Sequence, residues 1–319
     1  MSAGQVGRVV VIGAHILDVL GRPVESIPPG QGSARLSEIK ATAAGTAAGT
    51  AVDLAKLGAD VLSIGAIGDD LLGDMLIAAM RRHGVDTSGL VRKPDAQTSA
   101  TILPIRPNGE RPALHVPGAT SLLDRCDVDV TRLVGARALM IGAPDRLGGF
   151  VEDGLPDVIA AAEGALVAVD VLGQGTPKAF DRLRPLLAST DWFMPNGDQL
   201  LGLTGQPDHF SAIKEVLAVG AGGVAVTLGA DGCLVTTRDG DPVHLAALPA
   251  EVVDTTGCGD AFDAGMITGL LLGRDPVDAA RLGLACGALV ATGLGSDAGI
   301  TDLEQVLAFL DQHRLGGTS

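Results

Sequence analysis

Residues 254–265 read Asp-Thr-Thr-Gly-Cys-Gly-Asp-Ala-Phe-Asp-Ala-Gly, and an apolar helical pattern begins within this stretch. Gly257 and Gly259 allow a tight turn that a ligand can approach closely, because glycine has no side chain to clash. We expect the N–H groups of 257–260 to be free, and with the helix dipole they favour a phosphate or a developing oxyanion. Asp260 adds a carboxylate that can accept a proton from a hydroxyl. The stretch predicts phosphoryl transfer to an alcohol, although such a turn is often only a tight connection.

Apolar strand patterns alternate with helical patterns along most of the chain. This alternation predicts an α/β fold with a parallel sheet covered on both faces, whose ligands bind at the carboxyl ends of the strands. The expected strands are 8–13, 61–67, 137–141, 166–171, 190–194, 223–228 and 232–236. The expected helices are 47–57, 70–83, 150–163, 177–188, 211–219, 260–273, 275–291 and 301–314. The turns expected to converge at the ligand contain Gly13, Asn196, Gly229 and Gly257.

Two stretches, 16–42 and 97–117, stand apart from this alternation. The second contains a strand-like segment at 98–105, a turn at Asn108-Gly109 and a further segment at 111–116. This pattern is typical of a hairpin or meander.

The 254–265 stretch closely resembles the C-terminal signature of the ribokinase (PfkB) family of sugar and nucleoside kinases, D-T-x-G-A-G-D-x-F-x-A-G. The resemblance implies that Asp260 is the catalytic base and that backbone N–H groups of Gly257, Cys258 and Gly259 form an anion hole. Cys258 stands where alanine is usual. Cysteine is small enough to keep this geometry, and a buried small side chain is a better interpretation than a nucleophile.

Similar segments occur along nearly the whole chain and imply the family's fold. We expect one kinase domain over 1–319, with a ribokinase-like three-layer α/β/α fold, a mostly parallel central sheet and a small β-sheet lid formed by 16–42 and 97–117. A lid excludes water and so protects the γ-phosphoryl group from hydrolysis. In the family the lid is often a dimer contact, so the resemblance also implies a homodimer. Arg111 and His115 lie in this lid and are expected either to contact the substrate or to be exposed.

Residues 44–58 are similar to the family's G-G-x-x-x-N-x-A-x-x-L-A-x-L-G segment, with two departures. Ala44 replaces the first glycine, and Gly49 replaces an asparagine that commonly helps to bind the sugar, so the polar contacts of the substrate must differ. An aspartate after the first strand often binds substrate hydroxyls in the family, and a carboxylate suits polyols because it offers several lone pairs. Otherwise such an aspartate is most often a turn or cap residue. The acceptor-binding residues implied are Asp18, Gly45, Thr46, Gly49 and Arg111.

Two segments resemble the nucleotide site of the family. Residues 226–232 are similar to V-T-L-G-x-x-G, and residues 196–199 correspond to N-x-x-E, which organises magnesium and its waters. Gln199 replaces the glutamate with a neutral group that binds Mg²⁺ less well, and Asp198 is a substitute ligand. Asp254, with the backbone near 291–296, corresponds to a monovalent-cation site in some relatives. The implied cofactors are ATP and Mg²⁺, with K⁺ as a further candidate, and the implied ATP-binding residues are Asn196, Thr227, Gly229, Gly232, Gly257 and Gly259.

Composition narrows the function classes. The chain has 319 residues, 46% of them hydrophobic, which is enough for one large domain. A net charge of −15 without a Lys/Arg run argues against nucleic acid or an anionic membrane as partner. No apolar run approaches the ~20 residues that span a bilayer, and the N-terminus lacks a signal-peptide arrangement, so we expect a cytoplasmic protein. Four scattered cysteines without C-x-x-C argue against a zinc site or redox dithiol.

The residues near the diglycine turn and the aromatic content indicate the class of acceptor. Phosphofructokinases of the family commonly carry a basic residue near the diglycine turn, whereas 46–48 here read Thr-Ala-Ala, which favours an unphosphorylated acceptor. An aromatic content of 2% without tyrosine favours a sugar over a nucleoside, because aromatic rings often hold the base. A nucleoside kinase, a vitamin-precursor kinase and a non-catalytic sugar sensor remain alternatives, although the sensor has no need of Asp260. A dinucleotide oxidoreductase would need G-x-G-x-x-G at 13–18, which is absent.

Overall fold

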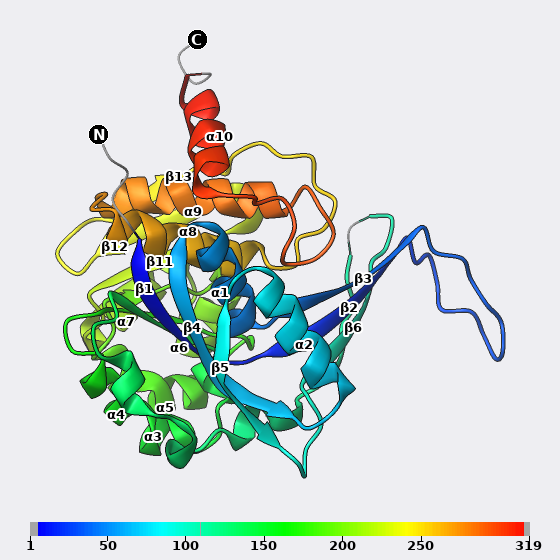
Figure 1. Cartoon of the computed structure of the whole chain (residues 1–319). Coiled ribbons are helices and arrows are strands. Elements are labelled where there is room, and N and C mark those ends of the chain that lie inside the picture. The colour runs from blue at the N-terminus through cyan, green and yellow to red at the C-terminus, as the bar shows by residue number, and fades with distance from the viewer. Residues whose placement is uncertain (1–5, 109, 316–319) are drawn as a thin grey trace.

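The computed structural model describes residues 6–108 and 110–315, and a large, mostly parallel sheet runs through the middle of this part of the chain (Figure 1). Its strand order is β13-β12-β11-β10-β9-β8-β1-β4-β5. Neighbours from β5 to β11 are parallel, whereas β12 and β13 pair antiparallel. The strands are β1 (Gly7–Gly13), β4 (Ala59–Gly68), β5 (Asp86–Lys93), β8 (Ala138–Gly142), β9 (Leu166–Asp170), β10 (Trp192–Phe193), β11 (Gly223–Thr227), β12 (Cys233–Thr237) and β13 (Val243–Leu245).

Helices cover both faces of this sheet because its central strands are apolar on both sides. In β1, Val11 packs in one buried cluster with Phe262, while the next residue, Ile12, packs in a second cluster with Phe180. The first cluster includes residues of α1 (Thr46–Lys56), α2 (Leu71–Arg82), α8 (Cys258–Leu271), α9 (Pro276–Val290) and α10 (Leu303–Leu315). The second includes residues of α3 (Phe150–Asp153), α4 (Leu155–Ala161), α5 (Pro177–Leu187), α6 (Gly197–Thr204) and α7 (His209–Val219). The predicted three-layer fold is confirmed.

A smaller sheet projects from one side of the molecule (Figure 1). It consists of β2 (Ile16–Arg22), β3 (Glu38–Ala44), β6 (Ala100–Pro104) and β7 (Leu114–Val116), in the order β3-β2-β6-β7. Its strands lie in the two segments predicted to form the lid, with β3 extending two residues beyond the first. β6 and β7 pair antiparallel, as the meander pattern predicts, whereas Gly109 of the predicted turn lies outside the described residues.

The local differences from the sequence prediction have physical causes. The predicted helix 150–163 is split at Gly154 into α3 and α4, and Pro156 lies in the first turn of α4, where its missing N–H costs nothing. The prediction missed β5, which is an edge strand of mixed polarity, and the very short β13. It also missed α6, an eight-residue helix that contains two glycines.

No helix within residues 6–108 and 110–315 combines the length and apolar character needed to cross a membrane.

Candidate active site

The turn before α8 presents free backbone donors to open space. Gly257 has a φ of 82° and caps the helix, and a Cβ there would lie 2.5 Å from the Cα of Ser296. In the described part of the chain, the N–H groups of Gly257, Gly259 and Asp260 have no acceptor. Cys258 differs from the expectation, because its N–H donates to the Thr255 carbonyl at 3.4 Å. A Cβ added at Gly259 would meet no atom within 4 Å, so an anion can approach these donors.

Asp260 lies in the first turn of α8 and faces α1. A Cβ at Gly49 of α1 would lie 2.3 Å from Asp260 Oδ2, so the absence of a side chain at position 49 makes room for this carboxyl group. Burial raises the pKa of Asp260 to about 7; the charge of Asp18 adds to this shift, and that of Arg111 opposes it. A carboxyl group with a pKa near neutrality is suited to general base catalysis.

Asp18 lies on the inner face of the lid sheet. The strand register pairs Asp18 with Thr101 and pairs Thr101 with His115. The three side chains therefore lie in a row on the same face of the lid sheet. Thr101 Oγ1 lies 3.1 Å from His115 Nδ1. Burial raises the pKa of Asp18 to about 6, partly offset by a hydrogen bond from Thr101.

Arg111 connects the lid directly to the anion-hole turn. Its Nε donates to Thr255 Oγ1 at 3.2 Å, and its Nη1 donates to Thr256 Oγ1 at 3.3 Å. Its charge also lowers the pKa of both Asp18 and Asp260, so it lies close to both carboxyl groups. The structure therefore brings together the predicted residues Asp18, Arg111 and Asp260, which are far apart in the sequence.

The predicted residues at the start of α1 differ in accessibility. Gly45 is the N-cap of α1 and is partly exposed. Thr46 is buried, and its hydroxyl has no partner among the described residues. The N–H groups of Ala47 and Ala48 point toward the Ala14 carbonyl, at 3.2 and 3.4 Å. This end of α1 is therefore closed by the chain itself, with Gly45 as its accessible part.

The predicted nucleotide residues gather at the carboxyl ends of β10 and β11. Asn196 and Thr227 form an isolated parallel bridge, and Gly229 follows with open space around the position of a Cβ. Gly232, by contrast, is buried, and a Cβ there would lie 1.9 Å from the Leu245 carbonyl oxygen. Gly232 thus contributes to the bend of the chain, while the other three border the open site.

Gln199 has a structural role that its position in the motif does not indicate. Its Oε1 accepts from Asn196 N at 2.8 Å, and Asn196 Oδ1 accepts from Gln199 N at 2.9 Å. This reciprocal pair is a capping box at the start of α6. Its Nε2 also donates to the Val171 carbonyl at 2.8 Å. Of the two predicted magnesium residues, only Asp198 is exposed and free of such contacts in the described structure.

Asp254 holds the anion-hole turn against a neighbouring loop. Its carboxylate accepts from Thr256 N at 3.0 Å, from Thr256 Oγ1 at 2.8 Å and from Gly295 N at 2.9 Å. The Ala291 carbonyl in turn accepts from Asp254 N at 3.3 Å. The structure therefore brings Asp254 and residues 291–296 together, with the carboxylate already bound by protein donors.

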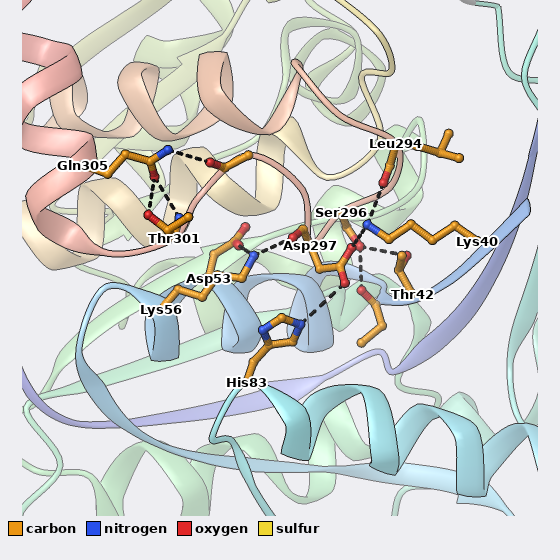
Figure 2. Close-up of polar contacts among 12 residues, drawn as sticks. Lys40, Thr42, Asp53, Lys56, His83, Leu294, Ser296, Asp297, Thr301 and Gln305 are labelled. Atoms are coloured by element: carbon orange, nitrogen blue, oxygen red, sulfur yellow. Dashed lines mark hydrogen bonds and ion pairs between the residues drawn. The ribbon is translucent and has the colours of Figure 1, made fainter. Parts of the chain in front are cut away.

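Of the loop at 294–297, the sequence prediction included the backbone up to residue 296, as part of a cation site, but not Asp297. Figure 2 shows Lys40 of the lid and Lys56 of α1 both reaching Asp297. Lys40 Nζ lies 2.5 Å from Asp297 Oδ1, and Lys56 Nζ donates to the Asp297 carbonyl at 2.7 Å. Ser296, which packs behind Gly257, donates to the Ala43 carbonyl at 2.6 Å. The loop thus joins the lid strand β3 and α1 to the back of the anion hole.

Two buried carboxyl groups beside the predicted base were also missed. Burial raises the pKa of both Asp170 and Asp263 well above the usual value, the two hydrogen-bond each other, and the charge of Asp260 adds to both shifts. Asp263 follows Asp260 by three residues on the same helix, and Asp170, the last residue of β9, lies next to the end of the predicted strand 166–171. These two positions were the available sequence signals. Within the described residues, no group of three His, Cys, Asp or Glu side chains has the geometry to hold a metal ion.

Comparisons with known proteins agree with this geometry. A family model described as pfkB family carbohydrate kinase matches residues 6–303. A deoxyribokinase of Salmonella typhi is 26% identical over 308 residues, covering 95% of this chain and 98% of the relative. A 2-dehydro-3-deoxygluconokinase of Bacillus subtilis is 26% identical over 282 residues, covering 85% and 87%. The crystal structure of a candidate ribokinase II from E. coli with ATP and Mg²⁺ has a TM-score of 0.83 at 25% identity, covering 96% of this chain and 100% of that one.

Proposed function

The chain belongs to the pfkB family of carbohydrate kinases, and we propose that it transfers the γ-phosphoryl group of ATP to a hydroxyl of an unphosphorylated sugar or sugar-like polyol. It is a phosphotransferase with a hydroxyl group as acceptor. The observation that carries the finer proposal is the start of α8, where three free N–H groups adjoin a carboxyl group of raised pKa. Donors for negative charge beside a base are what phosphoryl transfer requires.

In this proposal Asp260 is the general base. Its carboxylate accepts the proton of the acceptor hydroxyl, while the N–H groups of Gly257 and Gly259 stabilise negative charge on the transferred phosphoryl group. Cys258 shapes the turn, and because burial raises the pKa of its thiol to about 12, it does not act as a nucleophile.

The acceptor lies between the lid and α8. Asp18 accepts hydrogen bonds from its hydroxyl groups, and Arg111 holds the lid against the anion-hole turn. Gly45 is the accessible residue beside the acceptor, Gly49 makes room for the Asp260 carboxyl group, and the buried Thr46 supports the start of α1.

The nucleotide lies along Asn196, Thr227 and Gly229 toward the anion-hole turn. The open space at Gly229 and Gly259 leaves their backbone accessible to a nucleotide, and a similar protein has been crystallised with ATP and Mg²⁺. When bound, Mg²⁺ would neutralise charge on the phosphates, which supply much of its coordination. Asp198 is the protein group left to bind its waters, because Gln199 is occupied in the capping box. A K⁺ ion at Asp254 stays a prediction, which exchange of K⁺ for Na⁺ in the assay tests.

Two copies of the chain are proposed to pair through their lids. The outer face of the lid sheet carries exposed apolar side chains, among them Ile39, Ile102 and Leu114, which are 70%, 59% and 61% exposed. Ile102 and Leu114 are cross-strand neighbours, and Ile39 lies on the same face of the sheet in the edge strand β3. An exposed apolar face of a sheet is typical of an interaction surface.

The first experiment is a measurement of ADP release from Mg-ATP across unphosphorylated sugars, sugar acids and nucleosides. Turnover with a sugar or sugar acid is expected. Turnover confined to nucleosides would replace the sugar assignment with the alternative of a nucleoside kinase. Sugar binding by calorimetry without any ADP release would reject the kinase in favour of a sensor.

A further inference from the structure

Three side chains that can carry positive charge border the acceptor side of this acidic protein. Arg111 and His115 come from the lid segment, and Arg146 comes from the short 3-10 turn η4 (Pro144–Arg146) that follows β8. Arg146 was not among the predicted site residues. Its charge lowers the pKa of His115, second to the effect of burial. The loop after η4 packs against η1 (Gly118–Leu122), which follows His115 and β7 in the chain, because a Cβ at Gly148 would lie 2.4 Å from the Ser121 carbonyl oxygen.

The core holds Arg146 in a defined position. The carboxylate of Asp145 accepts from the N–H groups of Leu172 at 3.0 Å and Gly173 at 3.1 Å, and Arg146 Nε lies 3.1 Å from Asp145 Oδ2. A Cβ at Gly173 would lie 2.3 Å from Arg146 Nη2, so this glycine makes room for the guanidinium group. Neither Nη group has an acceptor within residues 6–108 and 110–315, and the side chain is 54% exposed.

Arg146 borders the same site as the base. The turn η4 follows β8 at the carboxyl edge of the sheet, where Ala143 N donates to the Asp170 carbonyl at 2.8 Å and a Cβ at Gly142 would lie 2.6 Å from Ala47 N of α1. The charges of both Asp260 and Asp145 add to the rise of the Asp170 pKa that burial causes. On the lid side, His115 lies next to Thr101, which lies next to Asp18. The acceptor space is therefore bordered by the carboxyl groups of Asp18 and Asp260, where phosphoryl transfer would occur. Arg146 and His115 border the part of this space that is farther from Asp260.

We propose that Arg146, with His115 of the lid, binds a carboxylate of the acceptor, so that the substrate is a sugar acid. This inference rests on the proposed kinase function. A guanidinium group with two free Nη donors matches a carboxylate in a bidentate pair, whereas a neutral sugar offers it only hydroxyl groups. Arg111 is a poorer candidate, because its Nε and Nη1 groups already donate to Thr255 and Thr256 and leave no free pair of Nη groups.

The charges around the site favour a carboxylate over a phosphate. The carboxyl groups of Asp18, Asp145 and Asp260 repel a phosphate dianion more strongly than a carboxylate monoanion. A sugar acid is also consistent with the prediction, made from residues 46–48, that the acceptor carries no phosphate.

The test compares sugar acids with neutral counterparts in binding and in turnover. D-gluconate and 2-dehydro-3-deoxy-D-gluconate are titrated by calorimetry against D-glucitol and D-ribose, with a non-hydrolysable ATP analogue and Mg²⁺ present. The wild-type protein is expected to bind an acid about 10- to 100-fold more tightly than the neutral compounds. Arg146→Gln should remove this preference, raise KM for the acid by a similar factor and change kcat little, and Arg146→Lys should restore part of the affinity.

Arg125→Gln is the matched control, because Arg125 is an exposed arginine in an ion pair with Asp157. It should leave the preference intact. The inference is overturned if no acid binds more tightly than the neutral compounds, if D-ribose 5-phosphate binds more tightly than the acids, or if both arginine variants act alike. Acid binding that depends on Arg146 without turnover would retain this subsite and reject the kinase; turnover of neutral sugars alone would retain the kinase and reject the subsite.

Discussion

Asp260 combines two properties at the level of a single residue. It adjoins free backbone donors, and burial raises its pKa to about 7. Since only the ionised form can accept a proton, the pKa of this group should control the rate in the neutral range.

The pH dependence of turnover follows from this shift. As pH falls through about 7, Asp260 becomes protonated and the rate should fall by up to about tenfold per pH unit, with a plateau at higher pH. A profile of kcat/KM from pH 5 to 9 measures this. A rate that is flat between pH 5 and 8 would show that ionisation of Asp260 does not limit turnover.

Gly49 is the second residue on which the position of the Asp260 carboxyl group depends. An alanine there would place a Cβ 2.3 Å from Asp260 Oδ2, and the side chain of Asp260 would have to move. Gly49→Ala should therefore lower kcat by about 10- to 100-fold, while the helix itself gains up to ~1 kcal/mol of stability from alanine. Gly149→Ala is the control, since a Cβ at that position meets only Asp153 Oδ2, at 3.7 Å. Equal kcat values for both variants would contradict the close approach.

At the level of elements, the 294–297 loop links the lid strand β3 and α1 to the anion-hole turn (Figure 2). Burial alone would raise the pKa of Asp297, yet the side chains of His83 and Lys40 hold it at about 2. A depressed carboxyl pKa stabilises the folded state above the unfolded pKa, and this contribution is lost as pH falls from about 4 to about 2.

Asp297→Ala should remove this support. The expected loss is about 1–3 kcal/mol in the free energy of unfolding at neutral pH, because Lys40 loses a partly buried partner, together with a lower kcat through displacement of Ser296 behind Gly257. Urea denaturation and steady-state kinetics measure the two effects. A variant with wild-type stability and kcat would show that the loop does not support the site.

The sequence predicts elements better than the contacts between them. The strands and helices with strong apolar periodicity, and the turn at 254–260, could be recognised because their signals are local. Asn196 and Gln199 form a capping box, a role that the resemblance of 196–199 to N-x-x-E does not indicate. Arg146 carries no local signal at all, because its position depends on the pairing of β8 with β9 and on where the lid lies.

At the scale of the whole molecule, the central sheet and the lid contribute different parts of the proposed site. The sheet brings turns that are distant in the sequence to its carboxyl edge, and the lid contributes Asp18 and Arg111. The outer face of the lid remains apolar and exposed, which supports pairing of two chains.

Ile102→Asp tests the pairing. A charge in the middle of the apolar face should convert a dimer into a monomer, because burying an unpaired carboxylate is costly. Light scattering after gel filtration measures the mass, and Phe210→Asp, at an exposed apolar residue of α7, is the control. A wild-type monomer at micromolar concentration would contradict the proposal.

The central claim is that Asp260 is the base of a phosphoryl transfer. The most direct measurement is the rate of ADP formation by Asp260→Asn with Mg-ATP and the best acceptor, alongside its affinity for ATP. Asp263→Asn is the matched control, because asparagine has the same shape and, like the protonated carboxyl group that the raised pKa of Asp263 favours, carries no charge. We predict a fall of about 10²- to 10⁴-fold in kcat for Asp260→Asn with ATP affinity unchanged, and near wild-type activity for Asp263→Asn. Retained turnover in Asp260→Asn would contradict the account.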